Sequence, residues 1–330
     1  MKTRIIHSDL EEMLIEIGYP NGLYSPGPGI MERSFCKEIP IGTGHYKELF
    51  FDGIHIGYGN FCLKQNTLMR FESDLEVVEM HFSLSGNYRG CRGIYADFEF
   101  GANQHNIFYS DGFAGDFEWS ATSNIETFEI HLTPEFFDKY IPLDIQAFRN
   151  FSKKVQQKET AMLSPNNFRI TSEMYFLIQS IISCTRKGKF KKMLIEAKVI
   201  ELLLLQLEQI SAGGTDQFYS IKRADVDKIH SVKDIILNSL NEQITLMDLA
   251  KEVGTNEFTL KKGFKEIFGQ TVFGFWREAK MEEAKNLLLT GEFNIAEVSD
   301  AIGYKNPQHF STAFKRKYGL SPREFRLRCA

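Results

Sequence analysis

The residues of this sequence best suited to recognising another molecule gather in two short segments of the C-terminal third. The first, from Gly254 to Gly269, reads GTNEFTLKKGFKEIFG, and the second, from Gly303 to Gly319, reads GYKNPQHFSTAFKRKYG. Lysine ammonium groups bind phosphate, whereas glutamine, serine and threonine side chains exchange hydrogen bonds with base edges. The two segments are therefore candidates for a surface that binds a polyanion.

Each segment follows a short predicted helix, and the two helices resemble one another. Thr245 and Asn294 are favourable N-cap residues. Gly254 and Gly303 then stand where a left-handed residue ends a helix. Because the apolar residues between cap and glycine correspond at an offset of 49 positions, the sequence predicts an internal repeat.

A second predicted helix follows in each copy, beginning after Asn256 or Asn306 and ending at Gly269 or Gly319. A short capped helix, a tight glycine turn and a second helix form the helix-turn-helix pattern. The stretch TVFGFWREAKMEEAKNLLLTG between the copies predicts an amphipathic helix, roughly 27 Å long. Adjacent major-groove segments on one face of DNA repeat about every 34 Å, so such a rod could hold both second helices in the groove.

A less specific interpretation is that the lysines form a solvated helix face, or that the hairpins belong to a helical solenoid. Matching caps, turns and terminal glycines in both copies favour DNA binding.

The charge distribution also favours DNA binding by the C-terminal part. Residues 221–330 carry 18 Lys+Arg and 15 Asp+Glu, a net of +3, whereas residues 1–220 carry 21 and 28, a net of -7. We expect only the C-terminal part to meet a polyanion.

The cysteines and the apolar segments argue against a zinc protein, a disulfide-stabilised protein, a secreted protein and a membrane protein. Five scattered cysteines without a C-x-x-C spacing argue against a zinc site and a disulfide framework. The N-terminus has no apolar run of signal-peptide length. The apolar stretch MLIEAKVIELLLLQLEQI is interrupted by Glu196, Lys198 and Glu201, so it does not predict a membrane span. We expect a cytoplasmic protein without membrane contact.

Residues 40 to 132 read as many short strands, which predicts an antiparallel barrel or sandwich. Ser164 before Pro165 predicts the start of a helix. A second helix is predicted from KFKKMLIEAKVIELLLLQLEQI, in which a stripe of apolar side chains is either a dimer seam or a face packed on the barrel. The stripe comprises Met193, Ile200, Leu203, Leu207 and Ile210.

The histidines of the strand-rich region raise the question of a metal. They are His45, His55, His81, His105 and His131, and no H-x-H pair occurs among them. We therefore expect packed or surface histidines, no protein-bound metal and no cofactor. Iron would enter already held by a chelator. Tyr88, Arg89, Arg92 and Trp119 are candidate pocket residues, since arginine and aromatic side chains suit an anionic aromatic ligand.

Residues about 230–328 resemble the DNA-binding domain of the AraC/XylS family of transcription regulators. The resemblance is carried by LAKEVGTNEFTLKKGFKEIFG, REAKMEEAKNLL and AIGYKNPQHFSTAFKRKYGLSPREFR. It implies a cupin-like sensor barrel and dimerising helices ahead of this domain. The stretch NEFTLKKGFKEIFGQTVFGFWRE further resembles the branch that senses ferric siderophores, the pyochelin-regulator type. Gly263, which costs about 1 kcal/mol inside a helix, is shared with that branch.

The outward positions of the second helices are Lys261, Lys262 and Lys265 in one copy and Gln308, His309, Ser311, Thr312 and Lys315 in the other. Carried over by position, the resemblance implies base contacts from Phe258, Lys261, Lys262, Gln308, Ser311 and Thr312, with Asn306 and His309 near the DNA backbone. Lys262 and Thr312 stand where arginine is frequent in the family, and lysine lacks the planar fork that arginine places on guanine. With the N-cap Asn256 included, the predicted DNA-binding residues are Asn256, Phe258, Lys261, Lys262, Lys265, Asn306, Gln308, His309, Ser311, Thr312 and Lys315.

We therefore expect a multidomain chain. Its parts are a cupin-like ligand-sensing antiparallel β-barrel at 1–160, a helical dimerisation or packing segment at 161–211, a linker at 212–220, and an all-α domain at 221–330 with two helix-turn-helix units joined by a long helix. The expected function is a sequence-specific transcription regulator, an activator of iron-uptake genes, rather than an enzyme. Its expected partners are double-stranded promoter DNA, a small-molecule effector with a ferric siderophore preferred, RNA polymerase and a second copy of the chain.

Two enzyme classes and a scaffold are the alternatives. A cupin-type metalloenzyme would need a metal in the barrel. A DNA-repair protein that carries this DNA-binding domain would need an activated cysteine or a metal site, which the scattered cysteines do not offer. An interaction scaffold would leave the outward lysines without a role.

Overall fold

The computed structural model describes residues 2–7, 12–19, 23, 29–39, 42–93, 98–121, 125–213, 223–242 and 244–329. Contacts within the chain divide it into two units. The first comprises Met1–Ile170 with Leu177–Asp216, and the second Thr171–Phe176 with Gln217–Ala330. The predicted linker falls largely on residues outside the described ranges.

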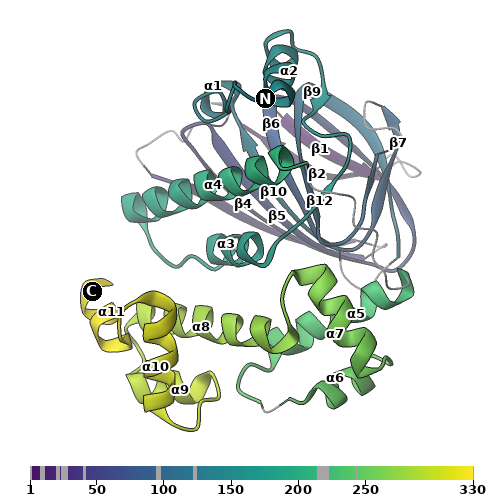
Figure 1. Cartoon of the computed structure of the whole chain (residues 1–330). Coiled ribbons are helices and arrows are strands. Elements are labelled where there is room, and N and C mark those ends of the chain that lie inside the picture. The colour runs from purple at the N-terminus through teal and green to yellow at the C-terminus, as the bar shows by residue number, and fades with distance from the viewer. Residues whose placement is uncertain are drawn as a thin grey trace. The chain divides into compact units, whose positions relative to one another are not determined.

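Strands dominate the first unit, where those of the described residues form one antiparallel sheet (Figure 1). Its main path runs β3-β4-β5-β10-β6-β9-β7-β8; β1 pairs with β2 and β6, while β11 and β12 pair with β9. The strands are β1 (Lys2–His7), β2 (Glu12–Gly18), β3 (Met31–Ile39), β4 (Gly42–Phe51), β5 (Ile54–Leu63), β6 (Thr67–Ser85), β7 (Tyr88–Gly93), β8 (Glu99–Phe100), β9 (Gln104–Trp119), β10 (Ile125–Leu132), β11 (Ala161–Met162) and β12 (Phe168–Arg169).

The sheet is larger than the sequence predicted, because strands already begin at Lys2 and Met31 rather than near residue 40. Side chains of its long central strand β6 alternate between the two faces. Val78, Met80 and Phe82 are fully buried on one face, while Glu79 and His81 lie on the other and line a cavity. Since side chains alternate across a strand, one β6 segment serves both an apolar core and a polar wall.

The helices of this region pack beside the sheet, and they include α4, the longest (Figure 1). Gln206 Nε2 of α4 donates to His105 Nδ1 of β9 over 2.9 Å, and His105 Nε2 donates to Gln209 Oε1 over 2.8 Å. The two glutamines thus hold His105 as a neutral imidazole between helix and sheet. These helices are α1 (Pro134–Phe137), α2 (Gln146–Gln156) and α4 (Gly188–Ser211), whereas α3 (Ser172–Ile182) is divided between the two units after Phe176.

Two predictions about these helices were wrong in detail. No helix starts at Ser164, because this residue lies between the short strands β11 and β12, which pair with distant β9, and α3 begins only at Ser172. The apolar stripe of α4 is also displaced. Leu203, Leu207 and Ile210 are buried within the chain, as the packed alternative requires, but Met193 is 67% exposed.

The second unit is helical and follows the predicted repeat closely. Its helices are α5 (Arg223–Asn238), α6 (Leu246–Glu252), α7 (Glu257–Phe268), α8 (Val272–Thr290), α9 (Ile295–Ala301), α10 (Pro307–Tyr318) and α11 (Pro322–Cys329). The predicted N-caps Thr245 and Asn294 both form full capping boxes with the third residue of their helix, Asp248 and Glu297. Such reciprocal bonds satisfy amide groups that a helix start leaves unpaired.

Apolar clusters fix the helix pairs. Phe264 of α7 packs 5.5 Å from Phe275 of α8 between ring centroids. Phe310 and Phe314 of α10 belong to a buried cluster that includes Met281 of α8 and Val298 of α9. The long helix α8 is therefore anchored at one end to α7 and along its second half to α9 and α10.

Two glycines close the first helix of each pair in the left-handed region, Gly254 at φ 67° and Gly303 at φ 71°. Their surroundings differ. A Cβ at Gly254 would meet no atom within 4 Å, whereas one at Gly303 would lie 2.5 Å from the Asn241 carbonyl oxygen. The turn between α9 and α10 therefore lies against the backbone after α5.

Among the described residues, no helix is long and apolar enough to cross a membrane.

Candidate nucleic-acid interface and candidate effector cavity

Helix α7 turns an apolar face inward and a polar face outward. Leu260, Phe264 and Phe268 are buried, while the predicted DNA-binding residues Asn256, Phe258, Lys261, Lys262 and Lys265 are all exposed. Phe258 is unusual among them, because 74% of a large aromatic side chain is open to solvent. An exposed aromatic ring beside three lysines suits contact with thymine methyl groups and phosphates.

Helix α10 repeats the arrangement. Phe310 and Phe314 are buried, and the predicted Asn306, Gln308, His309, Thr312 and Lys315 are exposed, whereas Ser311 is half-buried. The structure thus brings the predicted residues onto two outward helix faces, five on α7 and its cap and six on α10 and its cap.

Some of these side chains already have partners within the chain. Asn256 Oδ1 accepts from the Thr259 amide over 2.9 Å, and Asn306 Oδ1 accepts from the Gln308 amide over 2.8 Å. Both asparagines are N-caps, so their first role is to begin the helices. Lys261 pairs with Glu257 at 3.2 Å, but both side chains are largely exposed, so this pair contributes little stability.

An ion cluster holds α10 against α8. Lys317 Nζ lies 2.6 Å from Glu278 and 3.1 Å from Glu282, and Tyr318 Oη donates to Glu282 over 2.9 Å. Burial opposes the charged form of Glu282, but Lys285 and Lys317 outweigh burial and lower its pKa. The orientation of α10 is therefore fixed by apolar packing and by a partly buried carboxylate.

The first unit contains a cavity of about 120 Å³ lined by strands of the sheet. Nearly half of the residues that line it are phenylalanine, tyrosine or tryptophan. Trp119 stacks on Tyr88 at a centroid distance of 5.3 Å and on Phe71 at 5.9 Å. The buried Trp119 Nε1 has no hydrogen-bond partner among the described residues. A cavity with aromatic walls and a few polar groups is the usual form of a small-molecule site.

Two of the four candidate pocket residues line this cavity, namely Tyr88 and Trp119. Arg89 does not, because its side chain is 61% exposed and pairs with Glu118 at 2.7 Å. The Arg92 side chain lies outside the described residues. Besides hydroxyl groups, the polar side chains of the cavity are carboxylates and imidazoles.

Four of these groups occupy a crossed arrangement on two neighbouring strands. In the register of β6 and β10, Glu79 is opposite His131, and His81 is opposite Glu129. All four line the cavity. His81 Nδ1 lies 2.7 Å from Glu79 Oε1 and 3.8 Å from Glu129 Oε1, and His131 Nε2 lies 3.5 Å from Glu79 Oε2.

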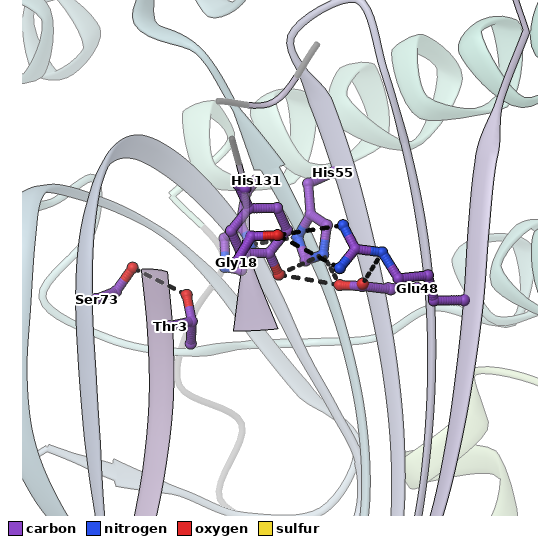
Figure 2. Close-up of polar contacts among 8 residues, drawn as sticks. Thr3, Gly18, Glu48, His55, Ser73 and His131 are labelled. Atoms are coloured by element: carbon purple, nitrogen blue, oxygen red, sulfur yellow. Dashed lines mark hydrogen bonds and ion pairs between the residues drawn. The ribbon is translucent and has the colours of Figure 1, made fainter. Parts of the chain in front are cut away.

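A row of hydrogen-bonded side chains continues from His131 toward the edge of the sheet (Figure 2). His131 Nδ1 lies 2.8 Å from His55 Nδ1, with the two rings stacked at 3°, and His55 Nε2 lies 3.0 Å from Glu48 Oε2. Arg33 Nε pairs with Glu48 Oε1 at 3.1 Å, and Tyr19 Oη donates to Glu48 over 2.9 Å. The cavity wall is therefore held by hydrogen bonds across several strands.

The pKa values of the histidines and glutamates in this wall are shifted in different directions. Burial lowers the pKa of His55. Burial also acts to lower the pKa of His131, but the hydrogen bond with Glu79 overcomes burial and raises it. Burial opposes ionisation of Glu79, yet bonds from His131 and His81 keep its pKa well below the ordinary value. Burial and the neighbouring charge of Glu79 raise the pKa of Glu129.

This cluster was not predicted, because the sequence contains no H-x-H pair. The available signal was E-x-H, which occurs as Glu79–His81 and again as Glu129–His131. Three of the five histidines, His55, His81 and His131, line the cavity. His105 is buried between α4 and β9 instead, and His45 is exposed.

Comparison with known families covers both units. The profile described as Regulatory protein PchR N-terminal domain matches residues 43–218, and the profile described as Helix-turn-helix domain matches residues 249–328. The first profile alone covers more than half of the chain. The chain belongs to the AraC family of regulators, in the PchR branch. The predicted resemblance is confirmed.

Individual regulatory proteins are similar to this chain over part of their length. The regulatory protein PchR of Pseudomonas aeruginosa is 34% identical over 37% of this chain and 42% of its own length. The xylose operon regulatory protein of Escherichia coli K12 is 28% identical over 40% of this chain and 32% of its own. A DNA-binding transcriptional dual regulator from Escherichia coli K-12 is similar in structure over 31% of this chain and 91% of that one, with 26% identity and a TM-score of 0.29. The chain thus spans less than half the length of these two regulatory proteins.

Proposed function

We propose that this AraC-family chain is a sequence-specific DNA-binding transcription regulator whose DNA-binding unit is controlled by a small molecule bound in the cavity of the sheet. The observation that carries the proposal is the repeated helix pair, α6–α7 and α9–α10, with matching caps, matching glycine turns and two outward polar faces. The family relationship supports the same function.

The two helix pairs act as two helix-turn-helix units, with α7 and α10 as recognition helices. Helix α8 between them has 19 residues, which corresponds to about 28 Å at 1.5 Å per residue. That length is close to the repeat of about 34 Å between major-groove segments on one face of DNA. One chain then contacts two successive segments, with Lys262 and Gln308 at base edges and Lys265 and Lys315 at phosphates.

The sheet acts as a cupin-like sensor, and its preferred effector is a ferric siderophore. Aromatic walls formed by Phe71, Tyr88 and Trp119 offer stacking surfaces to a flat aromatic ligand, and Trp119 Nε1 offers an N–H donor. The match to the PchR N-terminal domain supports a shared effector class. Effector binding shifts an equilibrium between two presentations of the DNA-binding unit.

A second copy of the chain and RNA polymerase are the expected protein partners of an activator. Large apolar side chains stand on the exposed face of α4, where Phe190, Met193 and Leu204 are 75%, 67% and 53% open to solvent. Such residues are suited to a helix–helix contact between two copies. The protein acts through occupancy of promoter DNA and not through catalysis.

The decisive test is the capture of DNA fragments from the source genome by the purified full-length chain, followed by sequencing. We expect a shared motif upstream of siderophore-uptake or metal-uptake genes. The triple variant Lys261→Ala, Lys262→Ala, Gln308→Ala is the matched control and should retain none of it. A motif beside unrelated genes would keep the regulator and reject the siderophore. Absence of any enriched motif, with and without candidate effectors, would reject the regulator itself.

A further inference from the structure

The crossed pairs on β6 and β10 place two carboxylates and two imidazoles on one wall of the cavity. Because the strands run antiparallel, the E-x-H of β6 meets the E-x-H of β10 in opposite order, which sets each glutamate beside a histidine of the other strand. A single strand could not produce this arrangement. It depends on the register between β6 and β10, and it therefore exists only in the folded sheet.

Three of these side chains converge closely. One ligand atom each from Glu79, His81 and Glu129 lies within 4.8 Å of the other two. Atoms that each lie about 2.0–2.2 Å from one metal ion are at most about 4.4 Å apart. If these side-chain atoms move by a few tenths of an ångström, all three can therefore coordinate one ion.

The surroundings of the three side chains match those that orient metal ligands. A ligating imidazole has its second nitrogen bound, and a ligating carboxylate has its second oxygen bound. His81 Nε2 contacts the hydroxyl of buried Tyr88, which leaves Nδ1 toward the carboxylates. Glu79 Oε2 faces His131, which leaves Oε1 toward His81.

His131 is itself held in place. Its Nδ1 meets His55, and His55 meets the fully buried Glu48, which also pairs with Arg33. This row of side chains sets the angle of the His131 ring and, through it, the position of Glu79. Ordinary ion pairing explains the set less well, because Glu79 has contacts from two histidines while Glu129 Oε1 is 3.8 Å from His81 Nδ1.

We propose that Glu79, His81 and Glu129 bind a divalent first-row transition-metal ion on the wall of the cavity, with His131 as a positioning residue for Glu79. Carboxylate and imidazole ligands together suit ions such as Mn²⁺, Fe²⁺, Co²⁺ and Zn²⁺, whereas Mg²⁺ and Ca²⁺ prefer oxygen alone. The remaining coordination positions face the aromatic cavity, where water or a donor atom of a chelating molecule completes the shell. This replaces the expectation that metal would enter the cavity only inside a chelator.

The test is titration of the metal-free full-length chain with Co²⁺, Zn²⁺ and Mg²⁺, followed by calorimetry and by the visible absorption of bound Co²⁺. We expect one Co²⁺ or Zn²⁺ per chain and no Mg²⁺. Glu79→Gln and Glu129→Gln preserve side-chain shape and should each reduce affinity by more than the about 10–100-fold that loss of an outer partner causes. Circular dichroism establishes that both variants fold.

Two controls locate the ion. Glu76→Gln alters a carboxylate on the same strand that binds Tyr109 and Lys158 instead, so it should bind metal normally. His45→Ala removes an exposed histidine whose Nε2 lies 3.8 Å from Cys36 Sγ, a competing surface site. Loss of binding in His45→Ala, with binding retained in Glu79→Gln, would place the ion on the surface and overturn the proposal.

The role of His131 has its own readout. His131→Ala should shift the absorption bands of bound Co²⁺ and weaken binding by about 10–100-fold, whereas His131→Gln, which keeps an N–H donor, should restore most of both. Unchanged bands in His131→Ala would remove the positioning role. Absence of stoichiometric binding in the unaltered chain would overturn the whole site. None of these readouts involves DNA, so failure of the metal site is distinguishable from failure of the proposed regulator.

Discussion

Glu79 on β6 and His131 on β10 are directly opposed in the strand register, and His131 Nε2 lies 3.5 Å from Glu79 Oε2. Fifty-two positions separate the two residues along the chain, so only the folded sheet brings them together. A slip of one residue in the β6–β10 register would turn one partner toward the opposite face. The polar wall of the cavity therefore depends on this one strand pairing.

Lys262 provides the first test of the DNA contacts. Its exposed position on the outward face of α7 leads us to expect that Lys262→Ala weakens binding to the selected DNA motif by about 1–3 kcal/mol. Lys251→Ala removes the same charge from the end of α6 and is the matched control. Gel-shift titration compares the variants on the motif and on scrambled DNA. Equal losses on both DNAs, or in both variants, would mean that Lys262 contributes only general charge.

Gly303 and Gly254 allow the effect of the same substitution on the free energy of unfolding to be compared at two equivalent positions. Both have positive φ, so alanine costs about 1–2 kcal/mol at either position. At Gly303 the new Cβ would in addition lie 2.5 Å from the Asn241 carbonyl oxygen, while at Gly254 it would meet nothing within 4 Å. We expect Gly303→Ala to lower the free energy of unfolding clearly more than Gly254→Ala, as measured by urea titration. Equal losses would show that the Asn241 backbone moves aside at little cost.

His105 predicts a loss of stability in acid. Burial lowers its pKa to about 4, whereas an unfolded chain has a histidine pKa of about 6.5. The neutral imidazole therefore stabilises the fold fully above about pH 6.5, and this contribution is lost as the pH falls toward 4. The lost free energy is at most about 3 kcal/mol.

The check is urea unfolding of the unaltered chain and of His105→Gln at pH 7.5 and pH 4.5. Glutamine stays neutral, so the variant should lose less stability between the two pH values. His45→Gln alters an exposed histidine and should follow the unaltered chain. The same loss in His105→Gln as in the unaltered chain would assign the acid sensitivity to other groups.

Glu282 tests how α10 is oriented. Glu282→Gln removes the charge that Lys285 and Lys317 share at 3.4 and 3.1 Å, so we expect thermal unfolding to show a loss of about 1–3 kcal/mol. DNA affinity should fall as well, because α10 is then less firmly docked on α8. Glu252→Gln, at an exposed position of α6, should change neither. Lower stability with unchanged DNA affinity would separate the ion cluster from recognition.

The helical unit could be predicted closely because its signals are local. Thr245, Asn294 and the closing glycines lie within a few residues of the bonds they form, and each was found where the sequence indicated. The sheet could be predicted only as a class. Strands β11 and β12 owe their conformation to pairing with distant β9, so a helix starting at Ser164 was a reasonable but wrong reading of the local pattern.

The candidate sites divide in the same way. The outward residues of α7 and α10 follow from helical periodicity. The polar wall of the cavity does not, since no local feature shows that Glu79 meets His131 or that His55 stacks on it. Repetition of E-x-H was visible, but its meaning required the antiparallel register.

The two tryptophans of the chain fall one in each unit. Trp119 is buried in the cavity wall against Tyr88 and Phe71, and Trp276 lies on α8 with the Lys280 ammonium 4.1 Å from its ring. The protein therefore carries a separate intrinsic fluorophore for each of its two units. Replacing Trp276 with phenylalanine leaves emission that reports only on the cavity, and replacing Trp119 leaves emission that reports only on the helical unit. Effector arrival and DNA engagement can thus be timed independently in one unlabelled chain.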